Sequence, residues 1–443
     1  MTDRAKPRFP GQWLTTATTR GEEAEHDTAR APAANRGAKA AMSGQAKLLL
    51  LVNGLFAVAN ALSGTFVNVY LWKVKSDYTM IASFAIAHQI TMALTFWLAG
   101  KWVKEHNKMN CLRLGVAMAA VFYSLVLALG AGSAVYVLPL GAVLGLSSGF
   151  FWLAFNVVYF EVTSPDTRDR FNGMAGLFGS LGGMIAPWVS GFLISRMTGN
   201  TGYRIIFALS LAVFVIGAVA SFFLHKRKES GHYEWFHGWR ALRRSGGPWR
   251  IVSLSLVAQG VREGVFGFAI GLLVYIATGN EMKLGNFALI SSGVALVSFW
   301  LVGKLLKPKY RRWGMLVGTV LMSAAIVPFF WQVSFATLLV FGIATAMFIP
   351  LYTIPITSVV FDLIGKDEES AAKRVEFIVL REVALNAGRL LGAAVFVLVV
   401  SLTSSPVALN WLLLGIGSSP VVSWMLIRRF LGERQQPSRF GRV

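Results

Sequence analysis

Two long apolar stretches of this chain, residues 251–277 and 376–401, are interrupted by charged side chains. These side chains are Arg262, Glu263, Arg381, Glu382 and Arg389. Burying an ionisable group in apolar surroundings is costly, so such residues are candidates for function. The arginines could attract an anionic or polar ligand. A carboxylate beside them could bind and release a proton as its surroundings change.

Their spacing limits which of these groups can pair. Arg262 lies about 17 Å along a helix that starts at Ile251, near the middle of a bilayer-spanning helix. Glu263 points about 100° away from it, so each needs a partner elsewhere, and we expect that partner on residues 376–401. There, one helix face carries Glu382, Asn386 and Arg389. A static set of interhelical ion pairs would explain the balanced charges equally well, and both interpretations stay open.

The other half of the chain offers milder polar groups within apolar segments. The candidates are Asn60, His88 and Asn156. His88 could relay protons, although a histidine in such a position more often forms a hydrogen bond between helices. The asparagines are typical of polar contacts that hold membrane helices together.

The elements that carry these residues are long apolar segments. Hydrophobic residues make up 55% of the 443 residues and charged ones only 14%. Segments of about 20 apolar residues are long enough to cross a bilayer. We predict twelve such helices, at about 48–72, 79–100, 109–131, 134–161, 171–195, 203–224, 251–277, 283–303, 313–331, 335–363, 376–401 and 406–430.

One short phrase occurs twice, after the second and the eighth predicted span. Residues 96–101 read FWLAGK and residues 299–304 read FWLVGK, and each copy has a further lysine three positions on. The chain therefore reads as two pseudo-equivalent halves of six spans. We place the halves at residues 47–224 and 251–430, joined by a linker at 225–250 and flanked by tails at 1–46 and 431–443.

This pattern resembles the major facilitator superfamily over about residues 48–430. The family's loop signature is degenerate here, because Lys104 stands where the family has aspartate and Glu105 where it has arginine. The resemblance implies an all-α membrane protein of two six-helix bundles, with a gate at the inner membrane edge. The gate candidates are Gly100, Lys101, Lys104, Lys108, Glu161, Arg168, Gly303, Lys304, Lys307 and Asp362. Ordinary interfacial charges are the alternative interpretation, since exposed pairs contribute only about 0–1 kcal/mol.

The basic residues predict the orientation. Most lysines and arginines of the loops follow even-numbered spans, which places both termini in the cytoplasm of a plasma-membrane protein. This distribution also accounts for much of the net charge of +21 without a nucleic-acid partner. We expect residues 1–46 to be a disordered tail, although Met42 could equally be the true start. Residues 233–244 could form a basic amphipathic helix on the inner leaflet, or simply a solvated linker.

The small residues Gly176, Gly179, Gly183, Ala186 and Ser190 form a strip that would let another helix approach closely. We find no signature of an enzyme, an ATP-binding loop, a metal site or a cofactor site. The sequence thus favours a monomeric secondary transporter of a small molecule, working by alternating access and coupled to protons.

Efflux is slightly favoured over import, by family analogy alone. A proton-coupled importer of an organic anion is one alternative, and a sensor or scaffold that transports nothing is the other. Removing residues 1–41 and 225–250 should abolish the function of a scaffold and largely spare a carrier.

Overall fold

The computed structural model describes residues 42–431, apart from residues 164, 226–230, 245–246, 367 and 404. The side chains of residue 160, residues 165–170 and residue 172 are also outside the description, so nothing is said of the predicted gate residue Arg168. The predicted tails lie almost entirely outside the described residues.

Twelve helical segments of the described chain are long and apolar enough to span a membrane. In the first half they are α1 (Gly44–Val74), α2 (Tyr78–Glu105), α3 (Lys108–Leu129), α4 (Val137–Val162), α5 (Pro165–Arg196) and α6 (Thr201–Phe222). In the second half, four spans are single helices, namely α8 (Pro248–Thr278), α9 (Glu281–Leu305), α11 (Phe335–Ile364) and α13 (Arg374–Leu402). The ninth span combines η3 (Pro308–Tyr310), α10 (Arg311–Ala324) and η4 (Val327–Phe330), and the twelfth combines α14 (Pro406–Gly417) and α15 (Ser419–Ile427).

Short loops with capping residues separate the spans. Asp77, Asn107 and Asn280 each accept hydrogen bonds from the first turn of the helix that follows, which satisfies backbone donors that have no partner within the helix. Ser43 does the same for α1, where its side chain accepts from the backbone nitrogen of Ala46 at 3.1 Å. The first helix therefore begins at Gly44, inside the segment that we had assigned to the tail.

The helix contacts repeat between the two halves. In the first half α1 packs on α5 and α6, α2 on α4, and α3 on α4 and α6. The equivalent spans of the second half pair in the same way: α8 with α13 and α15, α9 with α11, and α10 with α11 and α15. The main contacts between the halves, α2 with α13 and α5 with α9, are also equivalent to each other. This correspondence confirms the predicted internal repeat.

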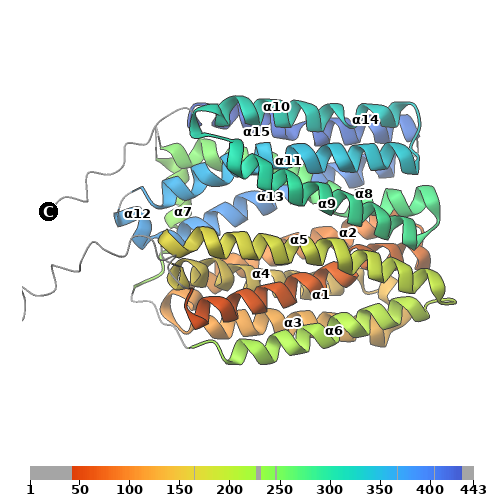
Figure 1. Cartoon of the computed structure of the whole chain (residues 1–443), viewed down its shortest axis with the longest axis horizontal. Coiled ribbons are helices and arrows are strands. Elements are labelled where there is room, and N and C mark those ends of the chain that lie inside the picture. The colour runs from red at the N-terminus through yellow and green to blue at the C-terminus, as the bar shows by residue number, and fades with distance from the viewer. Residues whose placement is uncertain are drawn as a thin grey trace, which may run out of the picture. The chain divides into compact units, whose positions relative to one another are not determined.

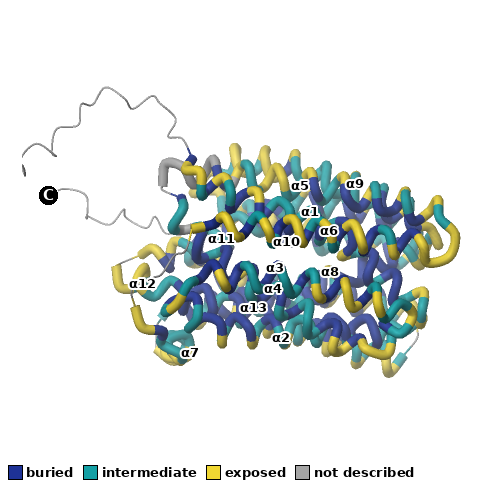
Figure 2. The backbone as a smooth tube through the Cα atoms, turned by 90° about the horizontal axis from the view of Figure 1, so that it is seen from below, coloured by how far each residue is buried: buried dark blue, intermediate teal, exposed yellow. Residues whose placement is uncertain are grey.

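Many residues on the outer helix faces are exposed (Figure 2). They include large apolar side chains such as Phe222, Trp300 and Leu398, which are 66%, 63% and 58% exposed. In water, so much exposed apolar surface would promote association, whereas lipid tails would cover it. The surface thus supports a membrane-spanning fold.

The second half of the predicted strip of small residues on α5 contacts other helices, and Ser292 of α9 donates to the carbonyl oxygen of Gly183 at 3.1 Å. The neighbouring Gly191, which the prediction did not include, also lies against α9. A Cβ atom added at Gly191 would lie 2.5 Å from the carbonyl oxygen of Glu281, so only glycine permits this approach of α9. Ser190 donates a hydrogen bond of 2.7 Å to the carbonyl oxygen of Leu62 in α1. At Gly176 and Gly179, by contrast, an added Cβ would meet no atom within 4 Å.

The segment between the halves lies at one end of the helices, together with α7 (His237–Arg243) and α12 (Glu368–Ala372) (Figure 1). We call this the linker end and the other the opposite end. The predicted surface helix over residues 233–244 is reduced to the seven residues of α7. The residues before it do not continue the helix, because Tyr233 is buried between the helices.

Candidate functional site

A cavity of about 260 Å³ lies between the two halves. Its walls come from α1, α2, α3 and α4 of the first half and from α8 of the second. The polar residues that line it are Asn60, Asn68, His88, Gln89, Tyr123 and Glu263. Phe84, Phe122 and Phe268 add aromatic surface. Three of the sequence candidates, from three different helices, thus converge on one space.

Glu263 is the carboxylate of this cavity, and it is held from two sides. Arg389 of α13 donates to Glu263 Oε2 from Nη2 at 2.8 Å and from Nε at 3.2 Å. Gln259, one helical turn before Glu263, donates to Oε1 at 2.7 Å. The Glu263 side chain is still 36% exposed. The partner that we predicted on residues 376–401 is therefore confirmed for Glu263.

The polar face of α13 continues from Arg389 toward the linker end. Arg389 Nη1 donates to Asn386 Oδ1 at 3.3 Å, and Asn386 Nδ2 donates to the carbonyl oxygen of Glu382 at 2.9 Å. The Glu382 carboxylate pairs at 2.6 Å with its neighbour Arg381. Glu382 is only 8% exposed and is not among the residues that line the cavity.

The expectation of a partner on α13 is wrong for Arg262. This side chain turns toward α11, where its Nη2 lies 3.4 Å from the Thr345 hydroxyl oxygen, and it stacks over the Phe266 ring at 4.8 Å. It is 8% exposed, and its Nε has no hydrogen-bond partner among the described residues. The cause is the 100° turn between neighbouring residues, which leaves Arg389 to Glu263 alone.

The remaining candidates of the first half differ in their surroundings. His88 Nε2 lies 3.1 Å from the hydroxyl oxygen of Ser148 in α4, and Asn60 donates to Phe56 of its own helix at 2.8 Å. Beside them Gln89 has a buried Oε1 atom without a hydrogen-bond partner in the described structure. Asn156 is half-buried and does not line the cavity.

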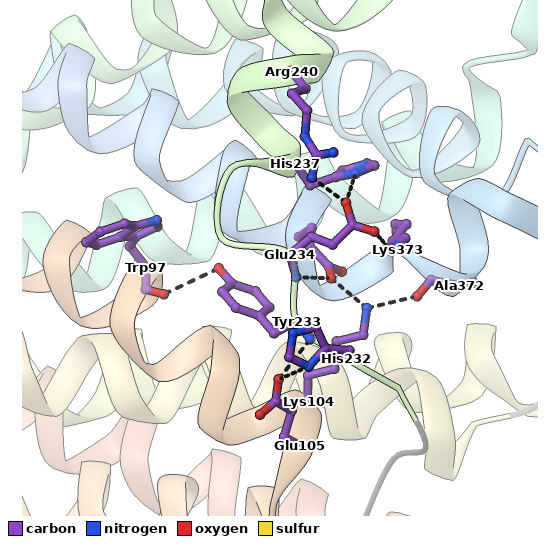
Figure 3. Close-up of polar contacts among 11 residues, drawn as sticks. Trp97, Lys104, Glu105, His232, Tyr233, Glu234, His237, Arg240, Ala372 and Lys373 are labelled. Atoms are coloured by element: carbon purple, nitrogen blue, oxygen red, sulfur yellow. Dashed lines mark hydrogen bonds and ion pairs between the residues drawn. The ribbon is translucent and has the colours of Figure 1, made fainter.

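At the linker end, a buried ion pair joins the two halves. Lys104 of α2 lies 2.6 Å from Glu376 of α13, and the two side chains are 4% and 1% exposed. Lys104 also donates to the carbonyl oxygen of Ala372 at 3.3 Å (Figure 3). The lysine that departs from the family's signature thus finds a carboxylate in the other half, a partner that sequence reasoning did not identify.

A second connection at the same end involves Glu161. Its carboxylate pairs with Lys108 within the first half and lies 3.5 Å from Arg374 of the second half. Asp362, at the equivalent position of the second half, pairs only loosely with Arg311, at 4.0 Å and within its own half. The two equivalent acids therefore have different partners.

The linker itself takes part in this closure, which the sequence did not predict. The Tyr233 hydroxyl donates to the carbonyl oxygen of Trp97 at 3.3 Å, and the Tyr233 backbone nitrogen donates to Glu105 at 3.0 Å (Figure 3). Glu234 faces the second half, where it pairs with Lys373. We call residues 232–235 the strap, because they connect α2 to the start of α13.

Gly100 makes room for the strap, whereas the second copy of the repeated phrase has no such role. A Cβ atom at Gly100 would lie 2.6 Å from the Tyr233 hydroxyl oxygen, but one at Gly303 would meet nothing within 4 Å. Among the described residues, neither Lys304 nor Lys307 forms an ion pair, and both are exposed. Lys101 is also peripheral, 3.9 Å from Glu105 of its own helix. The structure therefore does not bring the second copy into the closure.

The opposite end is joined by another ion pair between the halves. Lys73 at the end of α1 lies 3.1 Å from Glu281 at the start of α9, and the Tyr203 hydroxyl donates to the same carboxylate oxygen at 2.8 Å. Sequence reasoning missed this pair, because both residues lie at the ends of spans, where charges are expected. The described cavity thus lies between two sets of contacts that hold the halves together.

Twelve spans in two repeated halves, with a polar cavity between them and ion pairs at both ends, define a membrane transporter of the two-bundle class. The chain belongs to the Major Facilitator Superfamily, whose family model matches residues 49–372. This membership agrees with the resemblance found in the sequence.

Two bacterial proteins are similar to this chain in sequence, and both are uncharacterized. The chain is 41% identical to the uncharacterized protein YqgE of Bacillus subtilis over 371 residues, which cover 83% of this chain and 86% of that protein. It is 42% identical over 184 residues to an uncharacterized protein in the sodM 3′ region of Geobacillus stearothermophilus, covering 42% of this chain and 86% of that one.

Two solved transporters share the fold. The nucleoside transporter NupG matches with a TM-score of 0.63 at 15% identity, over 87% of this chain and 99% of that one. A bacterial homologue of the iron transporter ferroportin, outward-facing with soaked iron, matches with a TM-score of 0.58 at 16% identity, over 87% and 98%. Family and fold together support a secondary transporter.

Proposed function

We propose that this protein is a proton-coupled secondary transporter whose substrate binds in the cavity around Glu263. The observation that carries the proposal is the Glu263–Arg389 pair, which links α8 to α13 and opens onto the cavity. A proton on Glu263 would remove its negative charge and release Arg389. Proton binding at this position therefore changes the contact between two helices of the second half.

The cavity suits a small amphiphilic substrate. Its amide and carboxylate groups can form hydrogen bonds, and its aromatic rings can cover an apolar part of the ligand. At about 260 Å³ it lies just below the usual range of small-molecule sites, roughly 300–1,000 Å³. We propose export as the direction, with the linker end in the cytoplasm of a plasma-membrane protein that acts as a monomer.

The ion pairs at the two ends supply the gates of an alternating-access cycle. Lys104–Glu376 and Glu161–Arg374 would break when the linker end opens, and Lys73–Glu281 when the opposite end opens. Interfaces of this kind switch between discrete arrangements rather than deforming continuously. The state described here has both sets of contacts formed.

Import of an organic anion is the second candidate, and it depended on Arg262 as the anion-binding group. Arg262 is not among the residues that line the cavity, and it lies against Phe266 and Thr345. This placement favours a structural role for Arg262. If Arg262→Gln loses anion uptake while its folding is unchanged, import of an organic anion becomes the favoured function.

The test is a flux screen in proteoliposomes with an imposed pH gradient. The panel should include nucleosides and ferrous iron, since the solved neighbours are a nucleoside transporter and an iron-transporter homologue. Glu263→Gln should abolish gradient-driven flux and retain exchange of labelled for unlabelled substrate, which needs no net proton movement.

The matched control is Glu382→Gln, a second carboxylate at membrane depth that does not line the cavity. It should keep a pH dependence close to that of the unmodified protein. If Glu263→Gln leaves the pH dependence of flux unchanged, the assignment of Glu263 as the coupling group is wrong. Absence of any flux across the whole panel would favour the sensor or scaffold.

A further inference from the structure

A second cavity, of about 680 Å³, lies at the linker end and is separate from the cavity around Glu263. It is lined by α7 from the linker, by the first turn of α8, by the end of α11 with Lys366 just after it, and by α12 with the start of α13. Its volume falls within the usual range of small-molecule sites. Nothing in the transport cycle described above requires it.

The walls of this cavity are predominantly basic. Five basic side chains line it, namely His237, Arg240, Arg244, Lys366 and Lys373. The acidic lining residues are Glu234 and Glu369. Among the described residues, Arg244 and Lys366 take part in no ion pair, and both are exposed. The cavity therefore has two basic side chains that are available to bind an anion.

One carboxylate already shows what these groups bind. Glu234 is held by Lys373, by Arg240 at 2.6 Å and by His237 at 3.5 Å (Figure 3). The Lys373 ammonium, together with His237 and Arg240, lowers the pKa of Glu234 to about 2. Three basic groups converging on a single carboxylate form a cradle for an anion.

The backbone adds donors at the same place. Gly247, Pro248 and Trp249, at the start of α8, line the cavity. No side chain in the described part of the chain caps this helix. The Gly247 N–H donates to the carbonyl oxygen of Arg244 at 3.1 Å and Pro248 has no N–H, so the donors available at this helix start belong to Trp249 and the residues that follow it. Such groups favour negative charge. They supplement the basic side chains and would not form a site alone.

We propose that this cavity binds a phosphate-bearing anion, with Arg244 and Lys366 as the side chains that hold it. Proteins often bind phosphate with the planar guanidinium group of arginine and the ammonium group of lysine near a helix start. The occupant would touch both α7 and α12–α13, so it would connect the linker to the second half. It would thereby stabilise the strap in the closed position at the linker end.

The same chemistry is available from two sources, a soluble phosphate compound and the headgroup of an anionic lipid. Phe236 and Trp239 next to the cavity are 64% and 55% exposed, as expected for side chains near a membrane surface. The experiment therefore has two arms. Full-length protein is assayed in detergent with inorganic pyrophosphate, and in nanodiscs of phosphatidylglycerol against phosphatidylcholine.

The variant is Arg244→Gln combined with Lys366→Gln. The control is Lys307→Gln combined with Lys309→Gln, which removes the same charge from exposed positions away from the cavity. If the site exists, the first variant should lower the affinity for pyrophosphate by about tenfold or more. In the nanodisc arm, the same variant should lose the thermal stabilisation that phosphatidylglycerol gives over phosphatidylcholine. The control should match the unmodified protein.

Dependence on Arg244 and Lys366 in the detergent arm supports a soluble ligand, and dependence in the nanodisc arm alone supports a lipid headgroup. Equal behaviour of the two double variants in both arms, or no effect of either probe, overturns the proposal.

Discussion

Gly100 and Gly303 occupy the same position in two copies of one sequence phrase, but only Gly100 is under a packing constraint. The Tyr233 side chain lies directly over Gly100, whereas Gly303 faces open space. The sequence shows the repeat and not this difference, since it depends on a linker that only one copy contacts. We therefore expect the same substitution to have different effects on stability at these two equivalent positions.

Gly100→Ala should destabilise the protein and Gly303→Ala should not. The new methyl group at residue 100 would displace Tyr233, and overpacking of this kind costs about 1–3 kcal/mol. At residue 303, alanine favours the helix and has no neighbour to displace. Thermal unfolding of the two purified variants measures the difference. Equal melting temperatures would show that the strap does not depend on Gly100.

The polar and charged residues within apolar segments were the best predictor of the candidate site. Glu263, His88 and Asn60 were selected because polar groups are costly there, and all three line one cavity. Sequence reasoning failed for Arg262, because helical periodicity gives the direction of a side chain on its own helix but not which helix faces it. Asn68 and Gln89 lie in the same two predicted spans as Asn60 and His88 and also line the cavity, but they were not among the site candidates.

At the scale of elements, α2 and α13 form the closure of the linker end through one buried pair. Lys104→Met should lower stability by about 3–5 kcal/mol, because it leaves the Glu376 carboxylate buried without its partner. The matched control is Lys101→Met on the same helix, whose lysine is 45% exposed and only 3.9 Å from its acid. That change should leave the unfolding midpoint unaltered.

The double variant Lys104→Met with Glu376→Met separates stability from gating. An apolar pair of similar volume packs well in place of a buried ion pair, so stability should return close to that of the unmodified protein. Flux should fall, because water solvates the separated lysine and carboxylate when the linker end opens, whereas two exposed methionines gain no such hydration. Restored stability together with undiminished flux would remove this pair from the gate.

The strap adds a pH dependence to the same closure. The Lys373 hydrogen bond, together with His237 and Arg240, lowers the pKa of Glu234 from 4.5 to about 2, so the folded state favours the carboxylate. This stabilisation is complete above pH 4.5 and is lost as the pH falls from there toward 2. The backbone nitrogen of Glu234 also donates to Glu376 at 3.2 Å, so the strap and the buried pair are in contact.

Docking of the strap should therefore weaken between pH 4.5 and pH 3. A cysteine placed at Trp235, next to Glu234, should react faster with a thiol reagent at low pH, after correction for the thiolate fraction. Cys111, the only native cysteine, is fully buried and gives a low background. In the Glu234→Gln background the rate should be high at both pH values. A flat profile in the unmodified strap would show that Glu234 does not hold it.

At the scale of the whole molecule, the twelve spans and their division into halves followed from hydropathy and one repeated phrase. Hydropathy is averaged over many residues, so single exceptions do not hide a span. The repeated phrase lies at the same place in each half, so it can be recognised in the sequence alone. The contacts between the halves were less predictable. Lys73 and Glu281 are separated by 208 positions, and nothing in the sequence around either helix end marks them as partners.

The linker shows a further limit of the sequence. Its basic composition predicted a surface segment that a carrier could lose without harm. Tyr233 and Glu234 instead connect the two halves, so deletion of residues 225–250 should impair a carrier as well as a scaffold. Deletion of the linker therefore does not discriminate between a carrier and a scaffold, whereas a test of motion between the halves does.

Cross-linking provides that test. Lys104→Cys with Glu376→Cys joins the halves at the linker end, and Lys73→Cys with Glu281→Cys joins them at the opposite end. Alternating access requires each end to open once per cycle, so a short bis-methanethiosulfonate, which joins the two cysteines through disulfides, should stop flux with either pair. A reductant, which cleaves these disulfides, should restore flux. Locking one end should also increase labelling of cysteines placed at the other.

The control joins two helices of the same half at the same end, through Arg311→Cys with Asp362→Cys. The halves move as units in a rocking cycle, so this cross-link should leave flux largely intact. If flux survives either cross-link between the halves, they do not separate during transport, and the alternating-access mechanism is wrong for this protein. If the control pair also stops flux, movement within the second half is part of the cycle.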